Sequence, residues 1–277
     1  MLSQGSFTLT VGIPWNGTGD IKAALVKAQL SKCVNAIVIS PSSSVAYSRS
    51  KYASTGLDKV SILPPGDIGL YSAYRKIINA CVTSHLVFHG ADDMVNHTTL
   101  LPIDGLMEIS DSIIICSLLI LDPYASRTKR KKYNLLNQDI ELGRYASPAT
   151  PEVLYPVKIL KAINAPSLEY KIAGDADMFF SAKNAASDVR CLDIDFSTMR
   201  YGGLSTLPSR SILVFYENLR ISKKFNQVIP LSCRTYAFLF LFGRYILFRI
   251  LGDQASLSII AIFSKTKNYL CTLSLKK

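Results

Sequence analysis

The sequence predicts an α/β protein with a mostly parallel central sheet that helices cover on both faces. Three observations favour this fold class. Apolar segments of strand length alternate along the chain with segments of helical apolar spacing, which is the order of βαβ units. Several of the strand segments are continuously apolar, as expected for strands covered on both faces. The chain has 277 residues, which is long enough to bury such a core.

The first three elements are expected to be a strand, a helix and a strand. Phe7–Ile13 is rich in strand-forming residues and stops at Pro14. Asp20–Ser31 has the apolar spacing of an amphipathic helix, and Val34–Ile39 is a continuous apolar run. This order predicts a βαβ unit at the start of the sheet.

The same pattern continues through the middle of the chain. Lys59–Leu63 predicts a short strand, Gly69–Val82 a helix, and His85–Phe88 a strand that runs into a turn. Ser112–Leu121 predicts a further apolar strand. The basic segment that follows, Arg127–Lys132, is typical of a solvated hairpin turn.

Three helices and one extended segment are expected in the last part of the chain. Asp175–Ala186 and Leu213–Lys224 have helical patterns, and Asp193–Phe196 is extended between them. Tyr236–Leu251 is the most apolar stretch of the sequence and predicts a C-terminal helix.

Positive charge is concentrated at the end of the chain. The formal net charge is +11, and residues 209–277 carry +9 of it. These basic residues are mixed with Phe, Leu, Ile and Tyr, whereas nucleic-acid enzymes more often place basic residues around the phosphate site. The pattern favours an anionic membrane surface as partner and argues against nucleic acid.

We therefore divide the chain into an α/β domain over residues 1–224 and a basic, apolar helical tail over residues 225–277. Arg244 and Arg249 disfavour a membrane-spanning helix, because charged side chains are costly inside a bilayer. A helix that lies in the membrane interface fits better, with these arginines at the lipid headgroups. A helix packed on the catalytic domain is the alternative. The residues expected to enter the interface are Phe238, Leu241, Tyr245 and Phe248.

Cysteine usage and the N-terminus favour a cytoplasmic protein. The six cysteines contain no CxxC pair, so neither a zinc knuckle nor a redox motif is indicated. The first residues lack the basic and long apolar regions of a signal peptide. We expect a protein on the cytoplasmic side, peripheral on the inner face of the cell membrane.

Three clusters of carboxylates follow predicted strands: Gly66–Gly69, Gly90–Asp93 and Gly174–Asp177. Ligands of open α/β sheets bind at the carboxyl ends of strands. Neighbouring acids are costly to hold together unless a cation lies between them, and Mg²⁺ or Mn²⁺ takes ligands from carboxylates and substrate phosphates. The clusters therefore indicate a divalent-metal site, with simple turn chemistry as the alternative.

Three segments resemble the inverting family-2 glycosyltransferases. The run PPGDIGLYSAYRKIINACVTSHLVFHGADD looks like the donor-binding half of that family. SLEYKIAGDADMFFSAKNA is similar to its catalytic segment, and FSTMRYGGLST resembles its Gly-Gly segment. All three occur in family order over residues 7–224, and the branch that assembles bacterial exopolysaccharides such as colanic acid is the most similar.

The resemblance implies a GT-A type fold, a three-layer α/β/α nucleotide-binding domain, and a metal-dependent hexosyltransferase. Such an enzyme moves a sugar from a nucleotide diphosphate donor to a hydroxyl, with inversion at the anomeric carbon. The acceptor it implies is a growing glycan or a lipid-linked acceptor in cell-surface polysaccharide synthesis, of exopolysaccharide or lipopolysaccharide type.

The same resemblance implies roles for individual residues. Asp67 would contact the nucleoside of the donor. Asp93, with Asp92 behind it, would hold Mg²⁺ or Mn²⁺ as a Lewis acid for the departing diphosphate. Asp175 would act as general base toward the acceptor hydroxyl.

Four further residues are candidates for substrate binding. Asp177 is expected to orient the site or bind the acceptor. Arg75 and Lys76 are expected to approach the diphosphate, with the solvated face of their helix as the alternative. Trp15 is expected either to stack on the nucleobase or to pack in the core.

Two segments depart from the family pattern. The family usually has acids where this chain has Ser40–Val45, and a His-Gln pair where it has Pro148–Pro151. These departures keep a second function open, in which a catalytically impaired relative acts as a glycan-binding or scaffolding protein.

Overall fold

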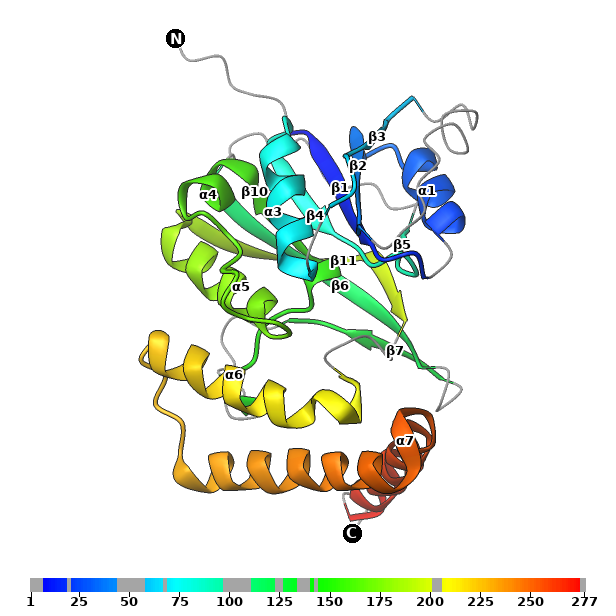
Figure 1. The fold of residues 1–277 in the computed structure, drawn as a ribbon, viewed down its shortest axis with the longest axis vertical. Helices are drawn as coiled ribbons and strands as arrows, with labels where there is room; N and C mark the ends of the chain where they lie inside the picture. Colours follow the sequence, from blue (N-terminus) through cyan, green and yellow to red (C-terminus); the bar gives the residue numbers. More distant parts are fainter. Residues whose placement is uncertain are drawn as a thin grey trace. The chain divides into compact units, whose positions relative to one another are not determined.

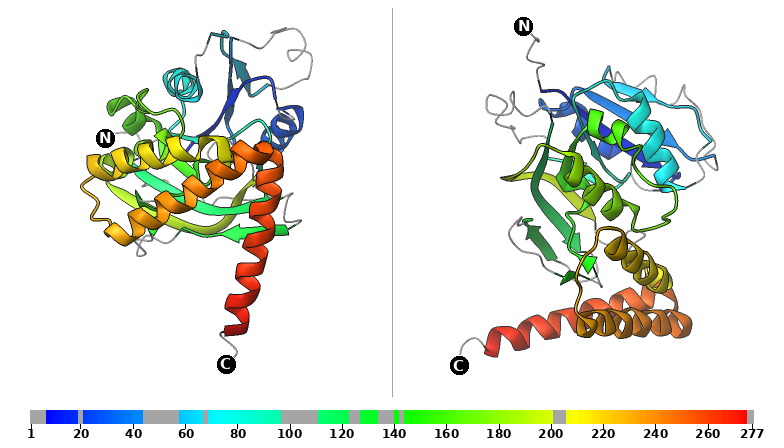
Figure 2. Two further views of the ribbon diagram at one scale, coloured as in Figure 1. Left: turned by 60° about the horizontal axis from the view of Figure 1, so that its bottom comes forward. Right: turned by 90° about the vertical axis from the view of Figure 1, so that its left-hand side faces the viewer.

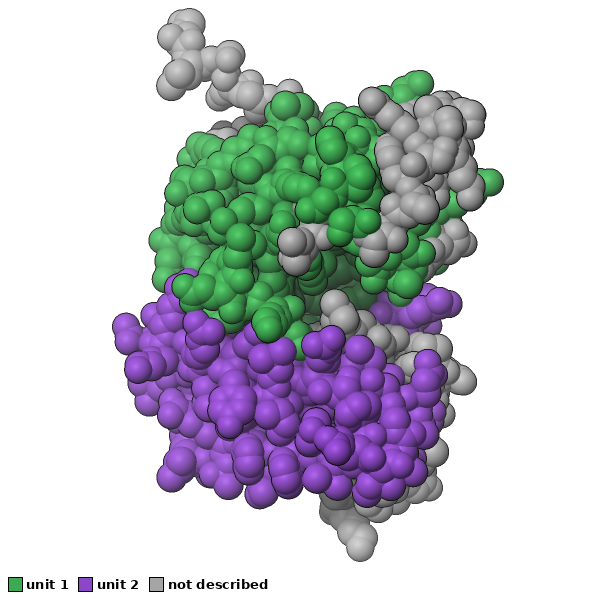
Figure 3. Space-filling view, in the orientation of Figure 1, with its two compact units in different colours: residues 1–119, 130–136, 147–199 green, residues 120–129, 137–146, 200–277 purple. Residues whose placement is uncertain are grey.

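The computed structural model describes residues 7–18, 21–43, 58–66, 69–96, 111–122, 127–133, 140–141, 144–200 and 206–274. The chain forms two compact units, coloured separately in Figure 3. The first comprises residues 1–119, 130–136 and 147–199, and the second comprises residues 120–129, 137–146 and 200–277.

This grouping differs from a division of the chain at Lys224. Helix α6 (Ser211–Lys224) belongs to the same unit as α7 (Leu231–Ser274). A separate function for residues 225–277 stays a prediction.

The parallel half of the central sheet is built as the sequence predicts (Figure 1). Strands β1 (Leu9–Trp15), β2 (Ala36–Pro41), β3 (Val60–Ile62) and β4 (His85–Phe88) have the order β3-β2-β1-β4 and all run in one direction. The helix Ile21–Leu30 connects β1 to β2, and the helix Leu70–Ala80 connects β3 to β4, as expected because parallel neighbours need crossover connections. The carboxyl ends of β1 and β4 therefore meet at one edge of the sheet.

The other half of the sheet is mixed. β10 (Val153–Pro156) runs antiparallel to both of its neighbours, β4 and β6 (Ser112–Asp122). β11 (Asp188–Arg200) follows β6 in the sheet and pairs antiparallel with β5 (Met94–Val95). The sequence patterns did not predict β5 or β10, because strands of two to four residues show no clear periodicity.

Helices cover both faces of the first unit's sheet, which confirms the predicted three layers. Leu9, Val11 and Ile13 of β1 lie in one apolar cluster with residues of α1 (Ile21–Leu30). The alternate residue Gly12 faces α3 (Leu70–Ala80), since a Cβ at Gly12 would lie 2.6 Å from the Ile77 side chain. Helices α4 (Val157–Ala162) and α5 (Gly174–Ala185) lie on the α3 side (Figures 1 and 2).

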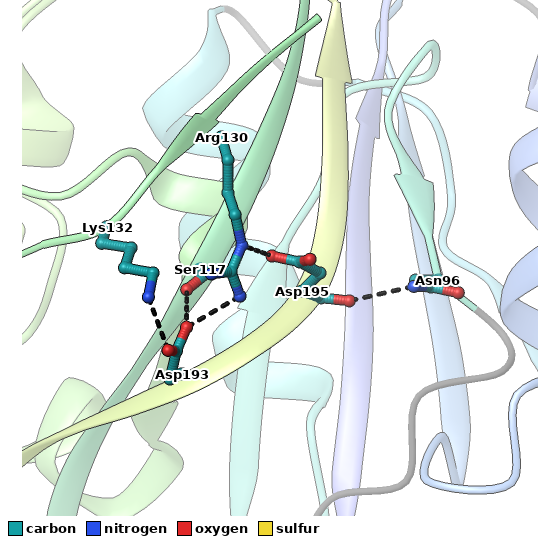
Figure 4. Close-up of polar contacts among 6 residues, drawn as sticks. All are labelled: Asn96, Ser117, Arg130, Lys132, Asp193 and Asp195. Carbon is teal, nitrogen blue, oxygen red and sulfur yellow. Dashed lines mark hydrogen bonds and ion pairs between the residues drawn. The ribbon is translucent and has the colours of Figure 1, made fainter.

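The basic segment after β6 is a strand, so its prediction as a solvated turn is wrong. β7 (Arg127–Lys131) pairs with β6, and its last two side chains, Arg130 and Lys131, form ion pairs with carboxylates. Arg130 contacts Asp193 and Asp195 of β11, with N···O distances of 2.7 and 2.5 Å (Figure 4). Lys131 points the other way, 3.6 Å from Glu152. Cross-strand ion pairs offset the repulsion that consecutive basic residues would otherwise cause.

The second unit contains a small hairpin and the two C-terminal helices. The hairpin pairs β8 (Ile140–Glu141) with β9 (Arg144–Tyr145). Arg144 Nε donates a hydrogen bond to Asn218 Oδ1 of α6 at 2.9 Å. The rings of Phe215 on α6 and Phe238 on α7 lie 5.4 Å apart, so an aromatic contact joins the two helices.

Helix α7 has a break at Gly252, where φ is 76° and the chain changes direction (Figure 2). Residues Leu231–Ile260 are long and apolar enough to cross a membrane, by length and composition alone.

Two details of the predicted membrane face are wrong. Leu241 was expected in the lipid interface, but it is buried inside the second unit. Arg244 was expected at the headgroups, but it is buried and donates a hydrogen bond to the Thr206 carbonyl. The reason is that one face of α7 packs within its own unit, and the apolarity of Tyr236–Leu251 does not show which face that is.

Candidate functional site

The predicted metal ligands lie together directly after β4. Asp93 is buried, and its Oδ2 accepts a hydrogen bond from the Gly90 amide at 2.7 Å. Asp92 is exposed. A Cβ at Gly90 would lie 3.1 Å from a carboxylate oxygen of each aspartate, so both carboxylates border the same small space. Glycine at this position leaves that space open.

This pair of carboxylates fits a hard divalent cation. Mg²⁺ usually takes one or two carboxylates and completes its octahedron with water and substrate phosphates. In the part of the chain that the structure describes, no group of three or more His, Cys, Asp or Glu side chains could hold a metal. A site made from these two carboxylates alone therefore needs the phosphates of a ligand, and a metal here stays a prediction.

The N-terminus of α5 carries the predicted general base and is held by a tyrosine from α3. The Tyr71 hydroxyl accepts hydrogen bonds from the amides of Gly174 at 2.8 Å and Asp175 at 3.3 Å, and it donates one to the Ile172 carbonyl. The first amides of a helix have no partner within the helix, so this hydroxyl serves as their cap. A Cβ at Gly174 would lie 2.7 Å from the Tyr71 ring, so glycine permits the contact.

The Asp175 carboxylate is half-buried and is contacted at both oxygens. Oδ1 accepts a hydrogen bond from the Ala176 amide at 2.8 Å. Oδ2 accepts one from Thr150 Oγ1 at 3.5 Å. The Thr150 side chain also affects Tyr74, whose raised pKa it partly lowers.

Asp93 and Asp175 converge on one buried side chain. Burial raises the pKa of Tyr74, and the negative charges of Asp175 and then Asp93 raise it further. The Tyr74 ring stacks on Phe88 of β4 at a centroid distance of 3.9 Å. The predicted metal ligand and the predicted base therefore both influence the pKa of the same buried tyrosine.

The negative charge of Asp175 also affects the pKa values of two further buried tyrosines. Burial raises the pKa of Tyr71 and of Tyr155, and in both cases the Asp175 carboxylate is the next largest cause. All three tyrosine hydroxyls are therefore protonated at neutral pH and are able to donate hydrogen bonds.

Trp15, Lys76 and Asp67 are the next predicted substrate-binding residues. Trp15 ends β1 and is half-buried against the core, and its Nε1 donates to the Thr18 carbonyl at 3.1 Å. Lys76 Nζ lies 3.6 Å from the Cβ position of Gly66, so this lysine borders the segment that leads into Asp67. Asp67 itself lies outside the described residues. Nucleobase and diphosphate contacts of Trp15, Lys76 and Asp67 stay predictions.

Arg75 forms hydrogen bonds within the fold, and Asp177 is buried in it. Arg75 donates hydrogen bonds to the carbonyls of Asn164 and Pro166, at 3.2 and 2.9 Å, and so ties α3 to the loop after α4. Asp177 is 2% exposed and lies on the buried side of α5. Their roles toward diphosphate and acceptor stay predictions as well.

Sequence reasoning missed two polar residues, Tyr74 and Thr150, that lie near Asp175. Tyr74 and Thr150 are 76 positions apart, and no spacing rule links them. Tyr71 belongs to the D-x-G-x-Y-x-A segment, which was the one signal available for it.

His89 is buried directly after β4. Its Nε2 lies 2.9 Å from Ser197 Oγ of β11, and burial lowers the pKa of this histidine to about 4. The ring is therefore neutral at pH 7.

Comparison with known proteins shows the fold. No family model matches the chain, and no curated protein matches its sequence. Among solved structures, S. aureus TarS residues 1–349 in complex with UDP-GlcNAc is 16% identical with a TM-score of 0.59, covering 92% of this chain and 79% of that one. The same TarS fragment with UDP is 16% identical with a TM-score of 0.57, covering 87% and 72%.

A longer TarS structure is 15% identical with a TM-score of 0.57. The match covers 87% of this chain, which spans only 44% of the length of that TarS chain. The likeness confirms a mixed α/β fold of the GT-A type.

Proposed function

We propose that this protein is an inverting glycosyltransferase that moves a sugar from a nucleotide diphosphate donor to a hydroxyl group. The observation that supports the proposal is that the Asp175 and Asp93 carboxylates both raise the pKa of the same buried side chain, Tyr74, as expected if a candidate diphosphate site and a candidate base share one region. Glycosyl transfer needs both groups, one for the leaving group and one for the attacking hydroxyl.

The chemistry follows from these positions. The Asp175 carboxylate accepts the proton of the acceptor hydroxyl, while that oxygen forms a bond to the anomeric carbon of the donor sugar. The bond from this carbon to the diphosphate oxygen breaks on the opposite side, which inverts the configuration. Asp92 and Asp93 would hold Mg²⁺ or Mn²⁺, which supplies Lewis-acid stabilisation of the diphosphate.

A nucleoside diphosphate sugar is the donor class that the comparisons support. The similar TarS structures contain UDP-GlcNAc and UDP, which are a sugar donor and its leaving group. In this chain β2 ends at Pro41, and the Ser42 amide donates to the Trp15 carbonyl at 2.8 Å. Ser40 is buried, whereas Ser42 is half-buried and Ser43 is exposed, so the hydroxyl groups of Ser42 and Ser43, rather than carboxylates, would contact the nucleoside after β2.

The lack of acids in Ser40–Val45 also favours a second candidate function. In this alternative the fold binds a glycan or scaffolds other proteins without turnover. Nucleotide binding separates the two functions, because a scaffold has no need of a donor site.

A thermal-shift panel of nucleoside diphosphates, with and without Mn²⁺, tests the proposed function. A ligand at 100 times its Kd stabilises the native state by about 2.7 kcal/mol, which is a clear rise in Tm. We expect at least one diphosphate to raise Tm more in Mn²⁺ than in chelator. Nucleoside monophosphates serve as the control. No shift with any diphosphate would favour the scaffold.

We also propose that α7 attaches the protein to the cytoplasmic face of an anionic membrane, where a lipid-linked acceptor lies. Several large apolar side chains of this helix are exposed, and Leu239 and Ile250 are 61% and 71% exposed. Arg249 is exposed near Ile250. Exposed apolar and basic groups on one helix suit an interface of headgroups and acyl chains. The exopolysaccharide-type acceptor rests on the sequence resemblance.

Liposome flotation tests this attachment with the full-length chain. We expect the protein to float with anionic vesicles at low salt and less at high salt, since each basic residue near an anionic leaflet contributes about 1 kcal/mol before screening. The double substitution Leu239→Gln, Ile250→Gln is expected to reduce flotation strongly. Val82→Gln removes an apolar side chain of the first unit that is even more exposed, at 93%, and is expected to change nothing. Full-length protein that stays unbound at low salt would contradict the proposal.

A further inference from the structure

Tyr71, in the first turn of α3, binds the start of α5 through its hydroxyl group. The hydroxyl donates its proton to the Ile172 carbonyl, because a carbonyl can only accept. It accepts hydrogen bonds from the amides of Gly174 at 2.8 Å and Asp175 at 3.3 Å. A hydroxyl offers one proton and two lone pairs, so the backbone around the start of α5 uses this group completely.

The N-cap residue of α5 cannot cap the helix. This residue is Ala173, which has no side-chain acceptor for the amides of the first turn, whereas Ser, Thr, Asp or Asn usually occupies such a position. Tyr71 supplies the missing acceptor from another helix. A Cβ at Gly174 would lie 2.7 Å from the Tyr71 ring, so glycine allows this approach.

α3 is also fixed to the beginning of the loop that leads into α5. Arg75 follows Tyr71 by four positions, so both side chains lie on the same face of α3. Arg75 Nη2 donates hydrogen bonds to the carbonyls of Asn164 and Pro166, at 3.2 and 2.9 Å. Tyr71 is 3% exposed and holds the end of the same loop. α3 therefore binds the loop at both of its ends.

The Asp175 carboxylate takes its place from this backbone. Its Oδ1 accepts a hydrogen bond from the amide of the next residue, Ala176, at 2.8 Å. The carboxylate is therefore bound to the same first turn of α5 whose amides Tyr71 holds. A shift of that turn moves the carboxylate with it.

We infer that Tyr71 is a positioning residue for the proposed reaction, because its hydroxyl holds the first turn of α5 and thereby sets where the Asp175 carboxylate lies. The inference rests on the proposed function, in which Asp175 is the base. Tyr71 acts through the backbone and not on the substrates, since its hydroxyl has no proton or lone pair left for a ligand.

Tyr71→Phe tests the inference, because it removes the hydroxyl and keeps the ring. The Ile172 carbonyl and the two amides then lose their partner, and buried backbone groups without a partner force the first turn of α5 to shift. A small misplacement of a catalytic group costs a large factor in rate, so we expect kcat to fall about 10-fold, with donor affinity by calorimetry unchanged. A wild-type kcat, or a donor affinity that falls as much as kcat, would overturn the inference.

Thr10→Val is the matched control for a loss of stability alone. Thr10 is fully buried, and its hydroxyl is hydrogen-bonded to that of Thr83 at 2.7 Å. Thr83 precedes β4, whereas Asp93 follows it, so this contact lies at the other end of the strand. We expect Thr10→Val to lower Tm, as Tyr71→Phe does, and to keep the wild-type kcat. An equal loss of kcat in both variants would show that the rate follows stability and would overturn the inference.

Amide hydrogen exchange gives a second readout that does not need turnover. In Tyr71→Phe the amides of Gly174 and Asp175 are expected to exchange about 10-fold faster than in the wild-type protein, which is the scale of one lost hydrogen bond. The Ala186 amide, which donates to the Ala182 carbonyl at the other end of α5, is expected to keep its rate. Unchanged exchange at Gly174 and Asp175 would overturn the inference. If the wild-type protein transfers no sugar, the proposed function fails, and the exchange rates still decide whether Tyr71 fixes the turn that carries Asp175.

Discussion

Asp175→Asn is expected to lower the rate of sugar transfer by about 10²-fold or more, while donor binding stays at the wild-type level. Asparagine has nearly the same shape as aspartate and keeps an oxygen for the Ala176 amide, which lies 2.8 Å from Oδ1 in the wild-type protein. It has no basic carboxylate, so it cannot take the proton of the acceptor hydroxyl. The loss should therefore appear in kcat.

The measurements are transfer to acceptor in single-turnover conditions and donor affinity by calorimetry. Asp188→Asn is the matched control, because Asp188 is half-exposed and paired with Arg190 at 2.8 Å, away from the groups around Tyr74. It is expected to keep the wild-type rate. Parallel losses of donor binding and turnover in Asp175→Asn would indicate a structural role for Asp175.

The elements of the first unit that carry the site could be predicted from local sequence patterns. The apolar run His85–Phe88 is β4, and the pattern over Asp175–Ala186 corresponds to α5 within one residue. Apolar periodicity depends only on residues close in the chain, so it can be recognised without knowledge of the tertiary structure. Asp93 and Asp175 could be proposed as site residues for the same reason, since each lies in a recognisable local segment, and their roles stay predictions.

Contacts between distant segments could not be predicted in this way. The contact of Thr150 with Asp175 joins residues 25 positions apart, and no periodicity of the sequence encodes it. The strand at Arg127–Lys131 was missed because its partners, Asp193 and Asp195, lie more than 60 residues away. Without these partners, a run of basic residues indicates a solvated segment.

The sequence of the C-terminal tail also does not show which of its apolar side chains are buried. Leu241 and Leu239 are two residues apart in one apolar run, yet the first is 1% exposed and the second 61%. Composition alone assigns both to the same environment. The packing of α7 within its own unit, including the contact of Phe238 with Phe215, separates the two leucines.

The second large effect is expected at Asp93, in the dependence of diphosphate binding on divalent metal. In the wild-type protein, Mn²⁺ should increase affinity for a nucleoside diphosphate, because a cation held by Asp92 and Asp93 neutralises the phosphates. Loss of groups that only support metal ligands typically costs 10- to 100-fold. Loss of a ligand itself should therefore weaken Mn²⁺-dependent binding by at least about 100-fold.

Asp93→Asn tests this more cleanly than Asp93→Ala. The Asp93 carboxylate also accepts the Gly90 amide at 2.7 Å, so alanine would remove a turn hydrogen bond together with the charge. Asparagine keeps the acceptor oxygen and removes only the charge. We expect Asp93→Asn to bind the diphosphate equally weakly with Mn²⁺ and with chelator, and Asp92→Asn to lose less, because Asp92 is exposed. Wild-type affinity of Asp93→Asn in Mn²⁺ would show that Asp93 holds no metal and acts only in the turn at Gly90.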